Sequence, residues 1–170
     1  MKLKLAIIFF IALVVLAKFT YDQMVPPFKS GETAPDFALT DMSGAIVRLS
    51  DFKGNPVIVH FWATWCSTCV EEMPLLNNFA ASHPEIKILA VNEDEGGLES
   101  VSQFFKNMKP AFTVLLDTGG MVSDRYKSYK VPESFLLNKD GGFVHRFVGM
   151  VPWDNPKIAD FIKKKLNYIN

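Results

Sequence analysis

Phe61-Trp-Ala-Thr-Trp-Cys-Ser-Thr-Cys69 is the stretch from which the fold and the chemistry of this chain can be inferred. The β-branched run Val57-Ile-Val-His60 before it is typical of a buried strand. After it, apolar residues recur at helical spacing from Val70 to Phe79, so the chain passes from strand to helix at the cysteines. Cys66 is therefore predicted at the first turn of a helix, where unpaired N–H groups and the helix dipole favour a thiolate.

The spacing of the two cysteines indicates a redox pair. Cys69 lies three residues after Cys66, on the same face of the predicted helix and close enough to close a small disulfide ring. A stabilised thiolate beside a second thiol is what thiol–disulfide exchange requires. A purely structural disulfide is disfavoured, because so small a ring removes little entropy from the unfolded chain.

No metal and no cofactor are expected. A zinc site would need two ligands besides the cysteines, and the three histidines are scattered along the chain. Residues 92–97, Asn-Glu-Asp-Glu-Gly-Gly, are acidic but lack the ligand spacing of a calcium loop. We expect them to form a solvated turn.

Four motifs occur in an order that one family shares. They are Gly31-Glu-Thr-Ala-Pro-Asp-Phe37, Leu49-Ser-Asp-Phe-Lys-Gly54, Phe61-Trp-Ala-Thr-Trp-Cys66 and Val131-Pro-Glu-Ser-Phe135. Together they resemble the TlpA/ResA/DsbE group of membrane-linked thiol–disulfide oxidoreductases. The resemblance runs from Gly31 to the C-terminus. It implies an α/β fold of the thioredoxin type, with an N-terminal β-hairpin and a central helix–strand insertion.

The periodicity of the chain supplies the elements of this fold. A hairpin is expected around Asp41-Met-Ser-Gly44, and an amphipathic helix from Leu98 to Met108. The remaining expected elements are a helix from the cysteines to about residue 82, strands at 86–91, 112–116, 134–137 and 143–148, a short helix at 121–126, and a last helix after Pro152.

Residues 1–20 form a leader, predicted as one N-terminal hydrophobic helix. Two lysines precede the run 5–17, which contains no charged residue. As a helix, residues 3–19 would span about 26 Å, which a thinned bilayer accepts. A signal anchor is favoured over a cleaved signal peptide, for which Val15-Leu-Ala17 offers small residues. In both cases the lysines stay inside and the domain is exported.

The predicted organisation is a leader at 1–20, a tether at 21–30 and a thioredoxin-like domain at 31–170. The leader predicts that the domain is exported. The resemblance implies that it lies in the bacterial cell envelope, anchored in the inner membrane and facing the periplasm, or free in the periplasm if the leader is cleaved. The 18 basic and 18 acidic residues balance, which argues against nucleic acid as the main partner.

Two further side chains are candidates for proton transfer. His60 is polar within an apolar strand, at a place where thioredoxin itself has an aspartate, so it is either a proton relay or a satisfied core histidine. Glu72 lies three residues after Cys69 and can share its face, whereas Glu71 points elsewhere. Spacing alone favours a solvated Glu72. The resemblance implies a functional acid, because ResA-like reductases carry one at this position.

Val131 and Pro132 lie at the entrance of a predicted strand. A trans bond is the ordinary expectation before proline, but the resemblance implies a cis-proline loop opposite the disulfide. Val131 would then pair with the backbone of an incoming peptide, and Trp65 and Pro132 would shape the docking surface. Glu133 recurs in the DsbE-like branch, so it either contacts the substrate or is a charge at the rim.

The predicted function is thiol–disulfide exchange, in which Cys66 attacks a partner disulfide and Cys69 resolves the product. The resemblance implies a reductant of apocytochrome c or of copper-centre assembly proteins, kept reduced by a membrane electron donor. Two alternatives stay open: a copper-binding module with the thiols as ligands, and a DsbA-like oxidase, since direction depends on reduction potential. A peroxiredoxin is disfavoured, because its Pro-Thr-Cys pattern is not met around Thr64 and Cys66.

Overall fold

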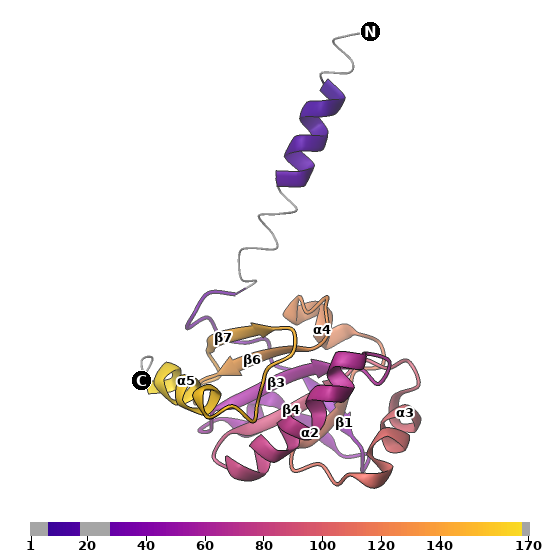
Figure 1. The fold of residues 1–170 in the computed structure, drawn as a ribbon, viewed down its shortest axis with the longest axis vertical. Helices are drawn as coiled ribbons and strands as arrows, with labels where there is room; N and C mark the ends of the chain where they lie inside the picture. Colours follow the sequence, from indigo (N-terminus) through magenta and orange to yellow (C-terminus); the bar gives the residue numbers. More distant parts are fainter. Residues whose placement is uncertain (1–6, 18–27, 168–170) are drawn as a thin grey trace.

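The computed structural model describes residues 7–17 and 28–167. Its centre is a seven-stranded mixed sheet with the strand order β2-β1-β5-β4-β3-β6-β7 (Figure 1). Strands β3, β4 and β5 run parallel, and β1 and β6 flank them antiparallel. The strands are β1 Ala38–Asp41, β2 Ile46–Arg48, β3 Val57–Trp62, β4 Lys87–Asn92, β5 Thr113–Leu116, β6 Glu133–Leu137 and β7 Phe143–Val148.

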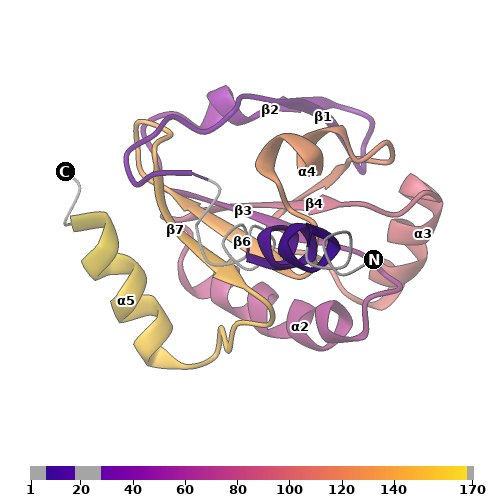
Figure 2. The ribbon, with the colours of Figure 1, turned by 90° about the horizontal axis from the view of Figure 1, so that it is seen from above.

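Helices cover both faces of the sheet, as Figure 2 shows with α2 on one side and α4 on the other. The α-helices are α2 Ser67–Ser82, α3 Gly97–Phe104, α4 Met121–Tyr126 and α5 Pro156–Asn167, with 3-10 turns η1 Leu49–Phe52 and η2 Phe105–Asn107. This arrangement confirms the thioredoxin-like fold expected from the motifs.

The alternation of β3 divides the core into two clusters. Ile58 and Trp62 pack with the cysteines and α2 on one face, whereas Val59 and Phe61 pack with Tyr126 of α4 on the other. All six residues of β3 are buried, since the strand lies between β4 and β6 and has a helix on each side. A strand buried on both faces reads as a continuous apolar run, and that is how 57–62 reads apart from His60.

The two additions to the core occur where the sequence predicts them. Strands β1 and β2 form the hairpin, with Leu39 opposite Val47, and the Asp41 carboxylate accepts the backbone N–H groups of Ser43 and Ala45 in the turn. Gly44 has a φ of +88°, which suits glycine. The central insertion supplies α3 and β5, and β1 joins the sheet by pairing with β5.

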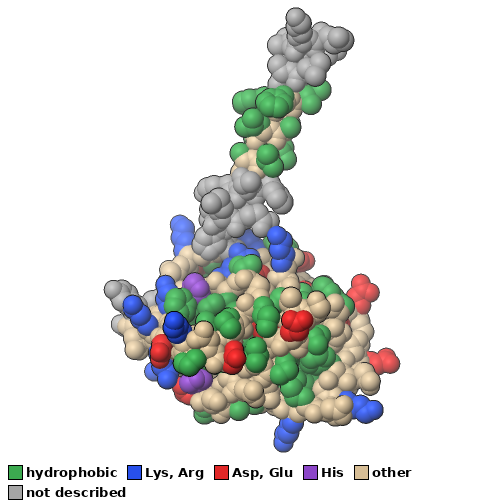
Figure 3. Space-filling view, viewed as in Figure 1, with side chains coloured by type: hydrophobic (Ala, Val, Ile, Leu, Met, Phe, Trp, Pro, Cys, Tyr) green, Lys and Arg blue, Asp and Glu red, His purple; other side chains and the backbone are tan. Residues whose placement is uncertain are grey.

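The leader and the tether are described only in part. Residues 7–17 form a helix whose apolar side chains are exposed (Figure 3). Neither this helix nor any other within 7–17 and 28–167 has the length and apolar character of a membrane span. The rest of the predicted leader, 1–6 and 18–20, and residues 21–27 of the predicted tether lie outside the described residues.

Phe28, at the end of the predicted tether, packs with the domain. Its ring stacks on Phe143 with centroids 4.1 Å apart and meets Tyr126 and Phe135 edge-on. Apolar contact therefore extends the packed domain to residue 28, three residues before the predicted boundary at Gly31.

Candidate active site

The connection from β3 to α2 presents the two cysteines at the end of the sheet. Cys66 is the N-cap of α2, with extended backbone angles, and its Sγ accepts the N–H of Cys69 at 3.2 Å. A side-chain acceptor at this position satisfies one of the unpaired donors of the first turn. The predicted place of Cys66, at the start of the helix, is confirmed.

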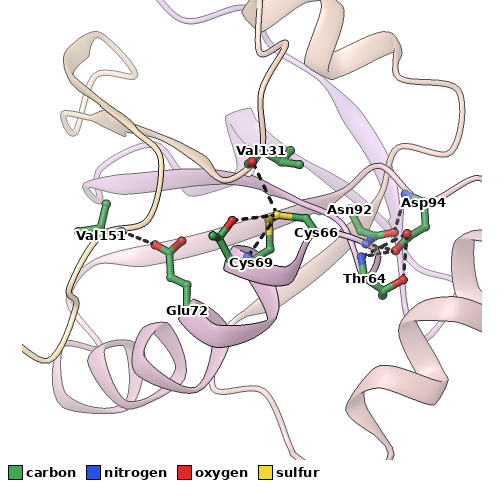
Figure 4. Close-up of a disulfide and its surroundings, with 9 residues drawn as sticks. Thr64, Cys66, Cys69, Glu72, Asn92, Asp94, Val131 and Val151 are labelled. Carbon is green, nitrogen blue, oxygen red and sulfur yellow. Dashed lines mark hydrogen bonds between the residues drawn. A yellow bond between two sulfur atoms is a disulfide. The ribbon is translucent and has the colours of Figure 1, made fainter.

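Cys66 and Cys69 form a disulfide, as Figure 4 shows. Cys66 is 7% exposed and Cys69 is fully buried, so only Cys66 keeps any exposed surface for a partner to approach. The Thr68 hydroxyl donates to Cys66 Sγ at 3.3 Å. A second donor at this sulfur favours a negative charge on it once the disulfide is reduced.

The Val131–Pro132 bond is cis, as the resemblance implies. The carbonyl oxygen of Val131 lies 3.6 Å from Cys66 Sγ (Figure 4), so this loop faces the reactive sulfur. Pro132 itself is buried, whereas Val131 is half-buried. The carbonyl of Pro132 accepts the N–H of Gly149 at 2.9 Å, which ties the loop to the end of β7.

Exposed apolar side chains lie beside the disulfide and the cis-proline loop. Trp65, next to Cys66, is 70% exposed, and Val148 at the end of β7 is 63% exposed. Val148 pairs with Glu133, directly after the cis-proline, and the exposed Met150 follows it by two residues. The sequence predicts Trp65 in this surface. It does not predict Val148 or Met150, because only the β6–β7 pairing brings them to the loop.

Glu72 is buried on the face of α2 that carries Cys69. Its Oε1 accepts the backbone N–H of Val151 at 3.1 Å and the indole N–H of Trp153. Burial raises the pKa of this carboxyl to about 7, and the two hydrogen bonds act in the opposite direction. The solvated glutamate that spacing alone favours is wrong, since packing of the loop after β7 covers the side chain.

His60 lies on the same face of the sheet as Ile58 and Trp62 and is fully buried. Its Nδ1 is 2.9 Å from the hydroxyl of Ser134, its neighbour on β6. Its Nε2 has no hydrogen-bond partner among the described residues. Burial lowers the pKa of His60 to about 3, so the imidazole is neutral at pH 7. One ring nitrogen of His60 therefore has a hydrogen-bond partner and the other has none among the described residues. This matches neither expectation fully, the proton relay or the satisfied core histidine.

Glu133 is fully buried and forms an ion pair with Arg146 of β7. It pairs with Phe61 in the sheet register, so its side chain lies on the α4 face, opposite to the cysteines. Its reading as a charge at the rim is therefore wrong. The pKa of Glu93 is raised to about 7 by burial and by nearby acids. Asp117 is the foremost of these acids, and Glu133 also contributes through charge repulsion.

Asp94 is a residue of the site that the sequence does not reveal. Its carboxylate accepts the backbone N–H of Thr64 at 3.0 Å, the Thr64 hydroxyl at 3.0 Å and the Asn92 amide at 2.6 Å (Figure 4). Asn92 and Asp94 are buried, so the solvated turn expected at 92–97 is wrong for these two. The available signal was their position at the carboxyl end of a buried parallel strand, beside the carboxyl end of β3.

Residues 30–146, more than half of the chain, match the family model described as AhpC/TSA family. The chain belongs to the AhpC/TSA family. Among curated members, it is 35% identical over 136 residues to the thiol-disulfide oxidoreductase ResA of Bacillus thuringiensis subsp. konkukian. The matched region covers 79% of this chain and 77% of that relative.

Two solved structures extend the similarity. A candidate thiol:disulfide interchange protein DsbE from Chlorobium tepidum superposes with a TM-score of 0.74 at 32% identity, covering 82% of this chain and 99% of that one. The exposed lipoprotein thioredoxin Etrx1 of Streptococcus pneumoniae gives 0.67 at 26% identity, covering 76% and 99%. This AhpC/TSA member is thus a thiol–disulfide oxidoreductase with a thioredoxin-like fold and a Cys66–Cys69 pair, as the motifs predicted.

Proposed function

We propose that this enzyme works outside the cytoplasm as a reductant of disulfides in partner proteins. The observation that carries the proposal is the asymmetry of the pair: Cys66 keeps a small exposed surface beside Val131, and Cys69 is fully buried on one helix face with Glu72. An accessible nucleophile and a shielded resolving thiol with a nearby base suit transfer of two electrons to a partner.

The first step belongs to Cys66. Its thiolate, favoured by the start of α2, attacks one sulfur of the partner disulfide. A mixed disulfide forms and the partner's other sulfur leaves as a thiolate. Trp65, Val131 and Pro132 then hold the partner segment, with the apolar surface of Val148 and Met150 beside them.

The second step needs Cys69 without its proton. Burial raises the pKa of a thiol, so a base must accept the proton before Cys69 attacks Cys66 Sγ. Glu72 suits this role, since its pKa lies near neutral pH. The attack re-forms the Cys66–Cys69 disulfide and releases the partner with two thiols. His60 is the second candidate base, and its low pKa makes it the weaker one at pH 7.

Three proposals concern the cellular setting. The exposed apolar helix 7–17 supports a leader at 1–20 that anchors the domain at 31–170 to the inner membrane, facing the periplasm. Proteins with disulfides, apocytochrome c or copper-centre assembly proteins, are the proposed substrates. A membrane electron donor would reduce the enzyme again.

A separate proposal concerns substrate binding. Glu133 would act on it from beneath the cis-proline loop, through its ion pair with Arg146.

A redox titration of the Cys66–Cys69 disulfide against thiol buffers tests the direction of electron flow. A reductant should have a reduction potential near or below that of thioredoxin, about −270 mV. A potential near that of DsbA, about −120 mV, would instead make the protein an oxidase. The same preparation should reduce insulin, and Cys66→Ser should abolish this. Stoichiometric copper binding without insulin reduction would favour the copper module.

A further inference from the structure

The loop between β7 and α5 holds Glu72 by one of its two carboxyl oxygens. Both the Val151 N–H and the Trp153 indole N–H donate to Oε1. The other oxygen, Oε2, is buried and has no hydrogen-bond partner within the described part of the chain. The two oxygens of this carboxyl group are therefore in different environments.

This difference determines where a proton resides. A proton on Oε1 would compete with two N–H donors for the same lone pairs, whereas a proton on Oε2 displaces none. The neutral acid therefore carries its proton on Oε2. In Figure 4, the oxygen bound to Val151 points away from the disulfide and the other points to the disulfide side. Cys69 and Glu72 also share one buried face of α2.

Trp153 is fixed well enough to impose this orientation. The side chain is 3% exposed, and its ring contacts Phe79 of α2, with centroids 5.1 Å apart, and Phe147 of β7, at 5.9 Å. The indole is therefore clamped between the helix that carries Glu72 and the strand that leads into the loop. A donor held from both sides needs no reorganisation when the charge on Glu72 changes.

We propose that Trp153 is a positioning residue for proton transfer at Cys69: with the Val151 N–H it occupies Oε1 and turns Oε2, the proton-carrying oxygen of Glu72, to the side of the Cys69 sulfur. The inference rests on the proposed role of Glu72 as the base for Cys69. It adds a residue 84 positions after Cys69 in the sequence to the machinery of resolution.

The histidines near this face are His60, His145 and His83, whose ring lies 4.6 Å from that of Phe79 at the end of α2. His60 on β3 has its pKa lowered to about 3 by burial. His145 on β7 has its pKa lowered by burial and by Lys165. The two cysteines do not titrate in the disulfide form.

Trp153→Phe tests the proposal, because it keeps a ring between Phe79 and Phe147 and removes the N–H together with part of the indole. Two N–H groups favour the ionised carboxylate, so losing one should raise the Glu72 pKa by about one unit. Carboxyl ¹³C NMR of the oxidised protein measures that pKa. The pH midpoint of the resolution step, followed from the mixed disulfide with a model substrate, should move up equally and slow resolution at pH 7 about fivefold.

The matched control is Trp62→Phe. The Trp62 indole N–H is also buried but has no hydrogen-bond partner among the described residues, so its loss should leave the Glu72 pKa unchanged. If Trp153→Phe does not fold, benzothienylalanine at position 153 replaces the N–H by sulfur in nearly the same shape. The proposal is overturned if the folded variant, whichever is used, keeps the parental Glu72 pKa and pH midpoint.

Glu72→Gln separates this inference from the proposed function. If Glu72→Gln exchanges at the parental rate, the role of Glu72 as the base fails. If it slows exchange while Trp153→Phe leaves the pH profile unchanged, only the positioning role of Trp153 fails. In the Glu72→Gln background, Trp153→Phe should cause no further change in the pH profile.

Discussion

Cys66 and Cys69 have the same side chain and different surroundings. Cys66 caps α2, receives the N–H of Cys69 and the Thr68 hydroxyl, and reaches the surface. Cys69 is one turn into the helix and fully buried. Donors and the helix dipole stabilise a thiolate at the first position, whereas desolvation disfavours one at the second. One residue type thus supplies both a nucleophile and a resolving thiol.

In the reduced protein, Cys66 should be alkylated well before Cys69 at neutral pH. Cys66 is the more accessible of the two, and a larger fraction of it is expected to be thiolate. Mass mapping after a brief iodoacetamide reaction measures the order. Equal or reversed labelling would exchange the roles given to the two cysteines.

Glu72→Gln keeps the shape of the side chain and removes the base. We expect exchange at neutral pH to slow about ten- to a hundredfold, as for the loss of one acid–base group. Stopped-flow tryptophan fluorescence across pH follows the reaction. Glu71→Gln is the control, since Glu71 is exposed on the same helix and should react at the parental rate. A parental rate and pH profile in Glu72→Gln would leave His60 as the remaining candidate base.

The same carboxyl makes stability depend on pH. Its pKa is about 7 in the folded protein and near 4.5 in an unfolded chain, so the folded state binds more protons between these values. Stability from this group therefore falls as pH rises from 4.5 to 7, by at most about 3 kcal/mol. Urea unfolding of oxidised Glu72→Gln should show it gaining on the parent by up to that amount between pH 4.5 and 8. A constant difference across this range would mean that Glu72 has an ordinary pKa.

At the scale of the element, the β3–α2 connection is held by its neighbours as well as by its own hydrogen bonds. Thr64 is bound to Asp94 at the end of β4, and Val131 lies across from Cys66 at the start of β6. The loop is thus hydrogen-bonded on the β4 side of the strand from which it emerges, and it contacts the cis-proline loop on the other side. Substitutions in the strand ends beside β3 should therefore disturb the motif even though they lie outside it.

Asp94→Ala should destabilise the oxidised protein by about 2–3 kcal/mol, because it leaves the Thr64 N–H and the Asn92 amide buried without an acceptor. Chemical denaturation measures the loss. Glu95→Ala is the control, since Glu95 is exposed in the same turn and should change stability by less than about 0.5 kcal/mol. Equal effects of the two substitutions would show that Asp94 does not hold the loop.

At the scale of the whole molecule, the sheet separates two kinds of core. The α2 face contains the redox pair, His60 and Glu72. The α4 face is packed with aromatic rings, among them Tyr126, Phe135 and Phe143, and Phe28 joins this set. Phe28 is thus attached on the face of the sheet that carries no cysteine.

A chain that begins at Phe28 should be as stable as the full protein, and one that begins at Gly31 should be less stable by about 1–2 kcal/mol. The reason is the loss of apolar contact and ring pairs made by Phe28. Urea unfolding of both shortened proteins measures this, and Phe28→Ala in the full chain should reproduce the loss. Equal stability of the two shortened chains would restore the domain boundary at residue 31.

The sequence by itself determined the elements and the order of the motifs. A β-branched run, a Cys-x-x-Cys pair and a helical repeat are local patterns, so the β3–α2 unit and the place of Cys66 followed from them. The hairpin around Gly44 followed from turn chemistry in the same way. The cis bond before Pro132 needed the resemblance, since few X–Pro bonds are cis.

Only the tertiary structure decided the environment of each polar side chain. Glu72 reads as an ordinary helical surface residue until Val151 and Trp153, some eighty positions away, cover it. Asp94 reads as part of a solvated turn until Thr64 binds it. Glu133 changes from a rim charge to a buried ion pair through its register with Phe61. Burial and pKa depend on what packs over a group from distant parts of the chain, and no local pattern encodes that contact.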